Sequence, residues 1–178
     1  LPDFLKKYSK IYVLAWTTTP WTLPSNTALT VGIKIDYALI KTYNLYTHKA
    51  INVIVAKDLI EKVFKSNFVE VKTEKELTFN SIKNIPYFIC ENFTGKDILE
   101  VKYNQLWDDA PLPENNPQNA FRIISGDFVT TDEGTGIVHT APTFGADDSL
   151  AAKNASPEVP PMLVYNEVKE LVPLVDLQ

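Results

Sequence analysis

Cysteine, histidine and methionine are nearly missing from this sequence of 178 residues. The chain has one cysteine, Cys90, one methionine, Met162, and two histidines, His48 and His139. A single cysteine excludes an internal disulfide, and one cysteine with two histidines cannot supply the four ligands of a zinc site. The methionine stands far from residue 1, so we expect residues 1–178 to be one domain excised from a larger protein.

Long apolar runs and an excess of positive charge are missing as well. No stretch approaches the roughly 18 uninterrupted apolar residues of a membrane span, and no signal-peptide pattern precedes Ile11. We therefore expect a cytoplasmic parent protein without a membrane partner. Acidic residues number 22 and basic residues 17, for a net charge of -5. A domain that binds a long nucleic-acid backbone needs a basic stripe, so this domain is not expected to be the main RNA anchor.

The motifs of three enzyme classes are also missing. Gly95-Lys96-Asp97 has neither the upstream glycine nor the following serine or threonine of a phosphate-binding loop. No His-Glu-x-x-His stretch indicates a zinc protease, and no Gly-x-Ser-x-Gly turn indicates a serine hydrolase. The Gly134-Thr-Gly136 stretch precedes a predicted strand rather than a helix, so it is expected to be a tight turn.

Strand signals outnumber helix signals along the chain. Segments rich in β-branched and aromatic residues predict eight short strands, at residues 11–17, 28–32, 37–43, 51–56, 68–73, 98–103, 121–125 and 136–141. Helical spacing is limited to residues 57–64 and, after Gly145, residues 146–155. Residues 104–119 contain several prolines and asparagines, which is typical of a surface loop. With 45% hydrophobic residues for one core, the pattern predicts a β-rich α+β fold, a β-barrel with peripheral helices.

The most informative stretch, residues 16–26, reads Trp-Thr-Thr-Thr-Pro-Trp-Thr-Leu-Pro-Ser-Asn. Its two prolines fix φ and remove two backbone donors, so the chain leaves the preceding strand in a defined shape. Strand alternation places Thr17 and Thr19 on one face and Thr18 on the other. Such threonines either bond their own backbone at a sheet edge or form the wall of a binding site.

A second polar stretch, residues 134–148, reads Gly-Thr-Gly-Ile-Val-His-Thr-Ala-Pro-Thr-Phe-Gly-Ala-Asp-Asp. Alternation puts His139 on an apolar strand face, and a lone histidine there is commonly a core residue. Asp147 and Asp148 open the second predicted helix, where carboxylates stabilise the free N–H groups of the first turn. Adjacent helical residues point about 100° apart, so only one of these carboxylates can face a pocket.

Both stretches resemble signatures of the editing domain of isoleucyl-tRNA synthetases. Residues 16–26 are similar to its threonine-rich signature, and residues 134–148 are similar to its second signature, in the same order. Between them, Gly95-Lys-Asp-Ile-Leu-Glu-Val-Lys-Tyr103 resembles a weaker family stretch, which usually has a glycine where Glu100 stands. The resemblance spans most of the chain and implies the same barrel with peripheral helices.

The resemblance implies hydrolysis of the ester that joins valine to the 3′-terminal ribose of tRNA(Ile). The catalytic residues that it implies are Thr18, Thr19, Asn26, His139 and Asp148, and the substrate-binding residues are Trp16, Thr17, Thr140, Phe144 and Gly145. Asp148 would bind the α-ammonium group of the ester, which leaves Asp147 as the helix cap. No nucleophile-base pair is evident, so a positioned water is expected to attack the ester.

Further roles and partners follow from the same resemblance. Thr18, Thr19 and Asn26 would orient water and ester, and His139 would limit the size of the entering side chain and bond the sugar or the water. The implied ligands are the aminoacylated 3′ end of tRNA(Ile) and a valine ester or valyl-adenylate, and the implied partners are the remaining domains of the synthetase. This domain is expected to need no cofactor, since ATP and Mg²⁺ would serve the ligating part of the parent enzyme.

A different class of function stays open on the sequence alone. A non-catalytic β-barrel that binds RNA or a partner protein would have similar composition and strand patterning. The acidic charge and the missing aromatic-basic platform count against RNA recruitment, but they do not exclude a protein partner.

Overall fold

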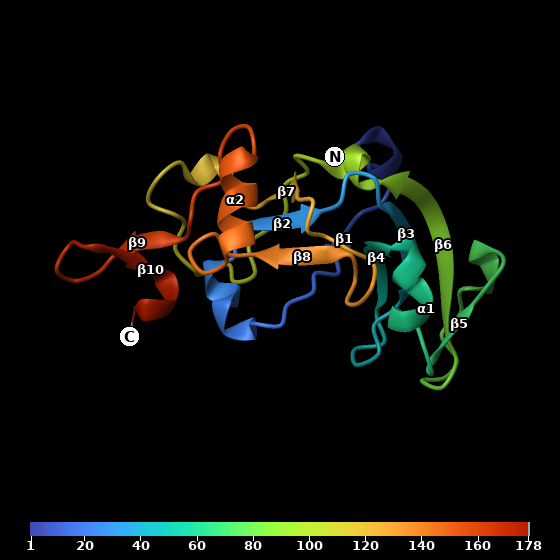
Figure 1. Ribbon diagram of the computed structural model, residues 1–178. Helices are drawn as coiled ribbons and strands as arrows, with labels where there is room; N and C mark the ends of the chain where they lie inside the picture. The colour runs from blue at the N-terminus through green and yellow to red at the C-terminus, as the bar shows by residue number, and fades with distance from the viewer. Residues whose placement is uncertain (178) are drawn as a thin grey trace.

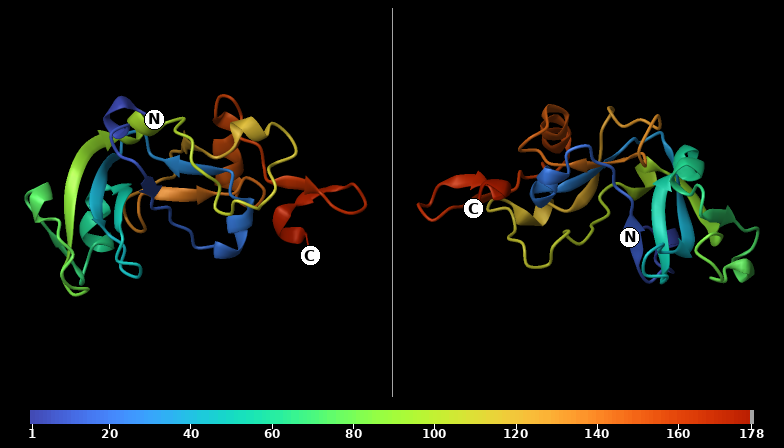
Figure 2. Two further views of the ribbon diagram at one scale, coloured as in Figure 1. Left: turned by 180° about the vertical axis from the view of Figure 1, so that it is seen from behind. Right: turned by 90° about the horizontal axis from the view of Figure 1, so that it is seen from below.

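The computed structural model describes residues 1–177, whose strands form three separate sheets. Figure 1 shows a five-stranded sheet at one end, a three-stranded sheet in the middle and a hairpin near the C-terminus at the other end. Figure 2 shows the same order of parts from behind and from below. Among the described residues, neither α-helix has the length and apolar content to cross a membrane.

The five-stranded sheet has the strand order β1-β4-β3-β6-β5. Its strands are β1 (Ile11–Val13), β3 (Asp36–Tyr43), β4 (Ala50–Ala56), β5 (Phe68–Glu70) and β6 (Ile85–Thr94). β3 is central and antiparallel to β4 and β6, whereas the edge strands β1 and β5 pair in parallel with their neighbours. Leu39 and Ile40 of β3 are fully buried and belong to one apolar core with Leu59, which ends a 3-10 turn, and Ile60, which begins the short helix α1 (Ile60–Val63).

The three-stranded sheet has the strand order β7-β2-β8. Its strands are β2 (Ala28–Val31), β7 (Arg122–Ser125) and β8 (Ile137–Thr140). β2 is parallel to β7 and antiparallel to β8, with Leu29 opposite His139. Helix α2 (Ala146–Asn154) packs on this sheet through its buried Ala151 and Ala152.

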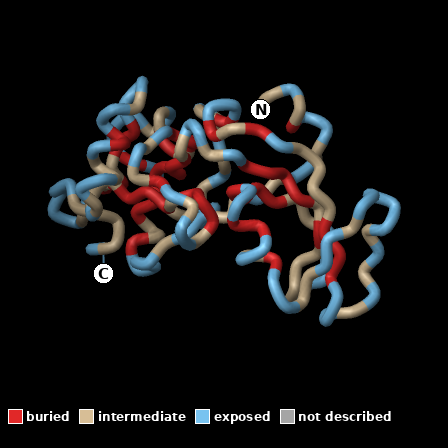
Figure 3. Tube along the Cα trace, turned by 45° about the vertical axis from the view of Figure 1, so that its right-hand side comes forward, coloured by how far each residue is buried: buried red, intermediate tan, exposed pale blue. Residues whose placement is uncertain are grey.

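The remaining sheet is the antiparallel hairpin of β9 (Leu163–Tyr165) and β10 (Leu171–Pro173). It stands at the end of the molecule away from the five-stranded sheet (Figure 2). Figure 3 shows that the buried parts of the chain concentrate in the two larger sheets, while loops and the hairpin are largely exposed. The packed core therefore lies in and between those sheets.

The chain that leaves β1 joins the two larger sheets. The Leu14 N–H donates to Ile54 O of β4 over 3.1 Å, and two residues later the Trp16 N–H donates to Ile137 O of β8 over 2.8 Å. Trp16 O in turn accepts the His139 N–H over 3.0 Å. The threonine stretch that follows Trp16 therefore begins directly beside β8.

Most of the predicted elements are confirmed, with differences at their ends, but one predicted strand is wrong. Residues 98–103 do not form a strand, because Gly95–Ile98 is a 3-10 helix and Glu100 has a left-handed backbone with φ 65°. Strand β6 and the hairpin strands β9 and β10 were not predicted. Both predicted helices are present, the first as a 3-10 turn that continues into α1 and the second as α2.

The closed sheet of the predicted β-barrel is not confirmed. Within residues 1–177 each sheet is open, and the five-stranded one ends at β1 and β5. The physical reason is that the chain after β6 turns into a 3-10 helix and then follows β7, so no strand closes the gap at β5. The coarser expectation, a β-rich α+β domain with helices outside mixed sheets, agrees with the structure.

Candidate active site

The threonine stretch runs from Trp16 into a 3-10 helix, Pro20–Ser25, which begins at a proline. The Thr17 and Thr19 hydroxyl oxygens lie 3.4 Å apart, and the Thr19 N–H donates to Thr17 Oγ1 over 3.0 Å. These two side chains therefore share one face, as strand alternation predicts. Thr18 lies between them and is exposed. The sheet-edge alternative holds in part, because Thr17 does bond the local backbone.

Thr22 connects this pair of hydroxyls to the interior. Its hydroxyl donates to Thr19 O over 2.8 Å, and its oxygen lies 3.2 Å from Thr19 Oγ1. Thr19, at the N-cap, and Thr22 are one turn of this 3-10 helix apart, and side chains at i and i+3 lie above one another in such a helix. Thr22 Oγ1 also lies 3.0 Å from His139 Nε2, so the buried Thr22 bridges the threonine stretch to β8.

His139 is only 5% exposed, and both of its ring nitrogens meet protein side chains. Nε2 faces Thr22, and Nδ1 lies 2.8 Å from Asn26 Nδ2. Burial lowers the pKa of His139 to about 4, because the charged ring would lose its hydration. The imidazole is therefore neutral at neutral pH, and a bond to sugar or water requires that one of its protein partners be displaced.

Asn26 is equally buried, and its amide orientation follows from its neighbours. Nδ2 lies 2.8 Å from Ala28 O and 3.4 Å from Thr140 O, and carbonyl oxygens can only accept. Its Oδ1 accepts the Tyr103 hydroxyl over 2.6 Å. The backbone of β2 and β8 thus fixes the amide with its nitrogen toward His139.

Asp148 lies half-buried in the first turn of α2. Its Oδ2 accepts the Ala141 N–H over 2.8 Å, which ties the carboxylate to the end of β8. Burial raises the pKa of Asp148, the Ala141 bond opposes the rise, and the charge of neighbouring Asp147 adds to it. A Cβ on Gly145 would lie 2.8 Å from Asp148 Cγ, so the glycine leaves room for this carboxylate.

The predicted division between the two carboxylates is partly revised. Asp147 is exposed in the first helical turn, where its charge faces the positive end of the helix. The N-cap position itself belongs to Gly145, which has no side chain to bond the helix. Asp147 is therefore not the hydrogen-bonding cap that the sequence predicts, whereas Asp148 is the inward carboxylate of the pair.

Of the remaining residues predicted for the site, Trp16 and Phe144 lie at the surface and Thr140 lies in the interior. Trp16 is 46% exposed and Phe144 is 47% exposed. A Cβ on Gly134 would lie 2.6 Å from the Trp16 ring, so the turn before β8 packs against that side chain. Thr140 is buried and bonds Thr30 Oγ1 over 2.6 Å, which turns its hydroxyl into the sheet.

Sequence reasoning missed two members of this cluster, Thr22 and Tyr103. Thr22 stands three residues after Thr19 in the threonine stretch, a spacing that indicates contact only once a 3-10 helix is expected. Tyr103 ends the weaker family stretch at residues 95–103, and its contact with Asn26 spans 77 residues of sequence. No local pattern predicts such a contact.

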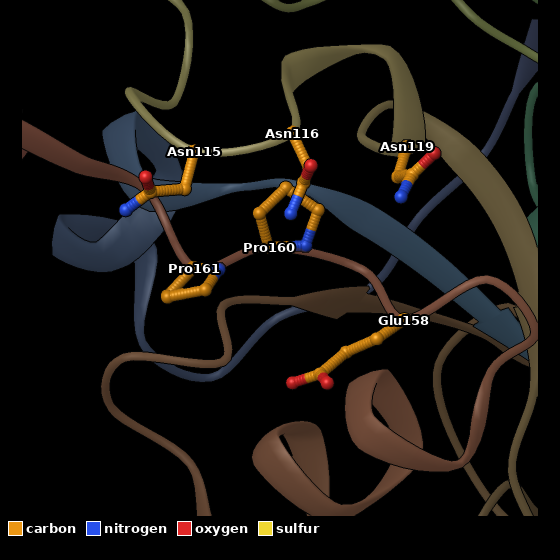
Figure 4. Close-up of a pocket in the computed structure, with 6 residues that line it drawn as sticks. All are labelled: Asn115, Asn116, Asn119, Glu158, Pro160 and Pro161. Carbon is orange, nitrogen blue, oxygen red and sulfur yellow. The ribbon is translucent and has the colours of Figure 1, made fainter.

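A cavity is present elsewhere in residues 1–177, away from this cluster. It has a volume of about 390 Å³ and is lined by Asn115, Asn116, Asn119, Glu158, Pro160 and Pro161. Figure 4 shows the three asparagines and the carboxylate around the two proline rings. This lining offers amides and one exposed acid but no nucleophile, histidine or acid-base pair, so it gives no basis for hydrolysis there.

The spacing of Thr22, His139 and Asn26 is that of a hydroxyl-imidazole-amide triad. The hydrogen bonds, however, run in the opposite direction to those of a working triad. In a working triad the third residue accepts a proton from Nδ1, which leaves Nε2 free to take the proton of the nucleophile. Here Asn26 presents its N–H to Nδ1, so the neutral ring carries its proton on Nε2, toward Thr22. Thr22 is consequently not activated as a nucleophile.

The fold places the chain in a class, the CP1-type domains. The crystal structure of GlLeuRS-CP1 matches 81% of this chain and 44% of its own chain, with a TM-score of 0.51 and 20% sequence identity. At that identity the match shows the fold alone. No protein-family model matches the sequence.

Similar sequences define the family more narrowly. The isoleucine–tRNA ligase of Bacteroides fragilis is 48% identical over 167 residues and that of Cytophaga hutchinsonii is 46% identical over 170 residues, each across 93% of this chain. The isoleucine–tRNA ligase of Clostridium tetani is 41% identical over 143 residues. The chain belongs to the isoleucine–tRNA ligase family as its CP1 domain, and it spans about 14% of the length of the first two relatives.

Proposed function

We propose that this domain hydrolyses the ester of valine mistakenly attached to tRNA(Ile), and that it also accepts valyl-adenylate. The observation that carries the proposal is the bonded cluster of Thr17, Thr19, Thr22 and His139. The Asp148 carboxylate is held beside it, at the end of strand β8, which contains His139. An isoleucine–tRNA ligase needs a hydrolytic step of this kind, because valine differs little from isoleucine. One methylene distinguishes isoleucine from valine by only about 1 to 3 kcal/mol, a magnitude already established for this family.

The chemistry that fits this cluster is attack by water. The water oxygen forms a bond to the ester carbonyl carbon and loses a proton, the bond from that carbon to the ribose oxygen breaks, and the ribose oxygen takes up the proton that the water lost. Free valine and uncharged tRNA result. A covalent route through Thr22 is disfavoured because this hydroxyl is buried, and because it accepts a hydrogen bond from His139 Nε2–H, which therefore cannot take the hydroxyl proton as a base.

Asp148 is the residue that we assign to the α-ammonium group of the ester. One carboxylate oxygen is held by the Ala141 N–H, which leaves the other oxygen for the ligand. A charge-assisted hydrogen bond at that point holds the ester and also sets its register against the attacking water.

The hydroxyls of Thr17, Thr18 and Thr19 are the groups that we assign to water and ribose. Thr18 and Thr19 are exposed and Thr17 is half-buried, so all three are within reach of a ligand on the surface. Asn26 and His139 lie beneath them and act on the ligand through Thr22 and Thr19. Trp16 and Phe144 are assigned to the walls of the site.

The partners and cofactors of the parent enzyme are proposed from family membership as well. The remaining domains of a cytoplasmic isoleucine–tRNA ligase would hold the body of the tRNA, and ATP and Mg²⁺ would serve its ligating part. In residues 1–177 no three His, Cys, Asp or Glu side chains are grouped to hold a metal ion, so we assign no step of the hydrolysis to one.

A deacylation assay tests the proposal. The ligase that contains this domain is mixed with valyl-tRNA(Ile) or with isoleucyl-tRNA(Ile), and the release of amino acid is followed over time. Valyl ester should be hydrolysed far faster than isoleucyl ester. Equal rates for the two esters would contradict size selection, and no rate above that in buffer for either would leave a non-catalytic binding module.

A further inference from the structure

We propose that Tyr103 is a positioning residue of the ester site, acting through Asn26 and His139 on the Thr19 hydroxyl. The inference rests on the proposed function and adds a residue from outside both long motifs. Its basis is a continuous hydrogen-bonded chain, Tyr103–Asn26–His139–Thr22–Thr19, that runs from the interior to the exposed threonines.

The direction of the protons in the inner half of the chain follows from the partners. Asn26 Nδ2 faces the carbonyl oxygens of Ala28 and Thr140, so this atom is the donor toward His139 Nδ1. A neutral imidazole has one N–H. Because Nδ1 accepts, the N–H sits on Nε2 and donates to Thr22 Oγ1.

The outer half of the chain follows in the same way. The Thr22 hydroxyl donates its hydrogen bond to Thr19 O. The two lone pairs of Thr22 Oγ1 can therefore accept from the His139 N–H and from the Thr19 O–H. The Thr19 proton therefore points inward, and its free lone pair points outward. Thr19 Oγ1 is thus held as an acceptor, which suits a ligand that donates, namely a water or a ribose hydroxyl, rather than the ester carbonyl oxygen.

Tyr103 closes the inner end of this chain. Its backbone N–H donates to Phe121 O over 2.9 Å, and its ring packs edge-on against the Phe121 ring, with the ring centroids 6.1 Å apart. The side chain is therefore held beside the start of β7. Burial raises the pKa of Tyr103, which keeps the hydroxyl protonated and able to donate. Without this donor the buried Asn26 Oδ1 has no partner, and the amide that orients His139 is less firmly fixed.

Matched tyrosine variants of the ligase test the proposal. Tyr103→Phe removes the hydroxyl bond to Asn26, and Tyr43→Phe removes a comparable half-buried bond to Leu77 O, 2.8 Å long, in the five-stranded sheet. On valyl-tRNA(Ile), Tyr103→Phe should lower kcat about tenfold to a hundredfold with KM changed by less than about twofold, because alignment rather than binding is lost. Tyr43→Phe should leave both constants near wild type, although both variants melt at a similarly lowered temperature.

A second pair of variants covers the case in which Tyr103→Phe does not fold. Thr22→Ser keeps the hydroxyl between His139 and Thr19, and Thr22→Val removes it at nearly the same size. The serine variant should retain kcat and the valine variant should lose it. Equal activity of the two Thr22 variants, or of Tyr103→Phe and Tyr43→Phe, overturns the positioning role while wild-type deacylation still stands. If the wild-type ligase does not release valine, the proposed function fails instead.

Discussion

Asn26 and His139 are joined by a contact of 2.8 Å in which the amide nitrogen, not the amide oxygen, faces the ring. The two carbonyl oxygens next to that nitrogen leave no other orientation for the side chain. The imidazole is thereby held neutral, with its proton on Nε2 and its basic nitrogen already occupied. Because of this one contact, the apparent catalytic triad has no free base for Thr22, which favours water as the nucleophile in the proposed hydrolysis.

A nuclear magnetic resonance titration of the 178-residue chain should show this state directly. With only two histidines, ¹⁵N-labelled imidazoles give two sets of signals, and His48 provides the internal control. His139 should appear as the Nε2–H tautomer and stay neutral well below pH 6, since its pKa is lowered to about 4. An Nδ1–H tautomer would contradict the Asn26-to-His139 direction of this hydrogen bond.

The same pKa shift predicts how stability depends on pH. The unfolded chain binds the histidine proton near pH 6.5 and the folded chain near pH 4, so the folded state loses stability as pH falls between these values. Below about pH 4 the loss levels off, at about 3 kcal/mol for the shift of this buried ring. Urea unfolding at several pH values should show this slope for wild type and His48→Ala, and should show it lost in His139→Gln.

The turn before β8 gives a prediction about stability alone. Gly136 has φ 72°, and an added Cβ would lie 2.3 Å from the Ala56 Cβ on β4. Gly136→Ala therefore combines backbone strain with overpacking and should lower the free energy of unfolding by about 2 to 5 kcal/mol. Gly32→Ala is the control, because its φ is not positive and the three atoms nearest the added Cβ all belong to the Ile35 side chain, which can shift. Similar losses in both variants, measured by urea unfolding, would contradict the argument.

The sequence was sufficient for elements whose signal is local. The Gly134-Thr-Gly136 turn needs positive φ at both glycines, with 73° and 72° in the structure, and the sequence predicts it from those glycines. Helix α2 begins after the Gly145 break, as the sequence predicts. Strand β6 was missed because Pro86 interrupts its pattern and because Cys90 is an extra residue between the pairs Leu39–Glu91 and Ile40–Ile89.

The sequence predicts four residues of the bonded cluster, namely Thr17, Thr19, Asn26 and His139, but it predicts neither Thr22 nor Tyr103, nor which side chains contact one another. Strand alternation correctly pairs Thr17 with Thr19, and helical spacing correctly separates Asp148, which is bonded to Ala141 N–H, from the exposed Asp147. The contact between Thr22 and His139 joins residues 117 apart, and the contact between Tyr103 and Asn26 joins residues 77 apart. Only packing of the sheets creates these contacts, so a local pattern cannot reveal that His139 is bonded on both sides.

The threonine stretch should show a graded response to loss of each hydroxyl. Thr19→Val removes the hydroxyl that bonds Thr22 and should slow release of valine by about tenfold to a hundredfold. Thr18→Val removes an exposed hydroxyl outside the chain of bonds that joins Thr19 to Thr22 and His139, so its effect depends on contact with the ligand alone and should be smaller. Thr19→Ser should recover most of the rate. The three variants are compared in deacylation of valyl-tRNA(Ile), and a larger effect at Thr18 would reverse the assignment.

Asp148 should be the more important of the two carboxylates that begin α2. Asp148→Asn keeps an oxygen to accept the Ala141 N–H but removes the charge, so the fold should remain while the bond to the α-ammonium group weakens. A hydrogen bond to a charged group contributes about 1.5 to 3 kcal/mol, which predicts release of valine slowed by about tenfold or more. Asp147→Asn removes an exposed charge near the helix start and should leave the rate near wild type. Deacylation and thermal melting of both variants decide the case: a slow Asp147→Asn beside an active Asp148→Asn would mean that the outer carboxylate binds the ester.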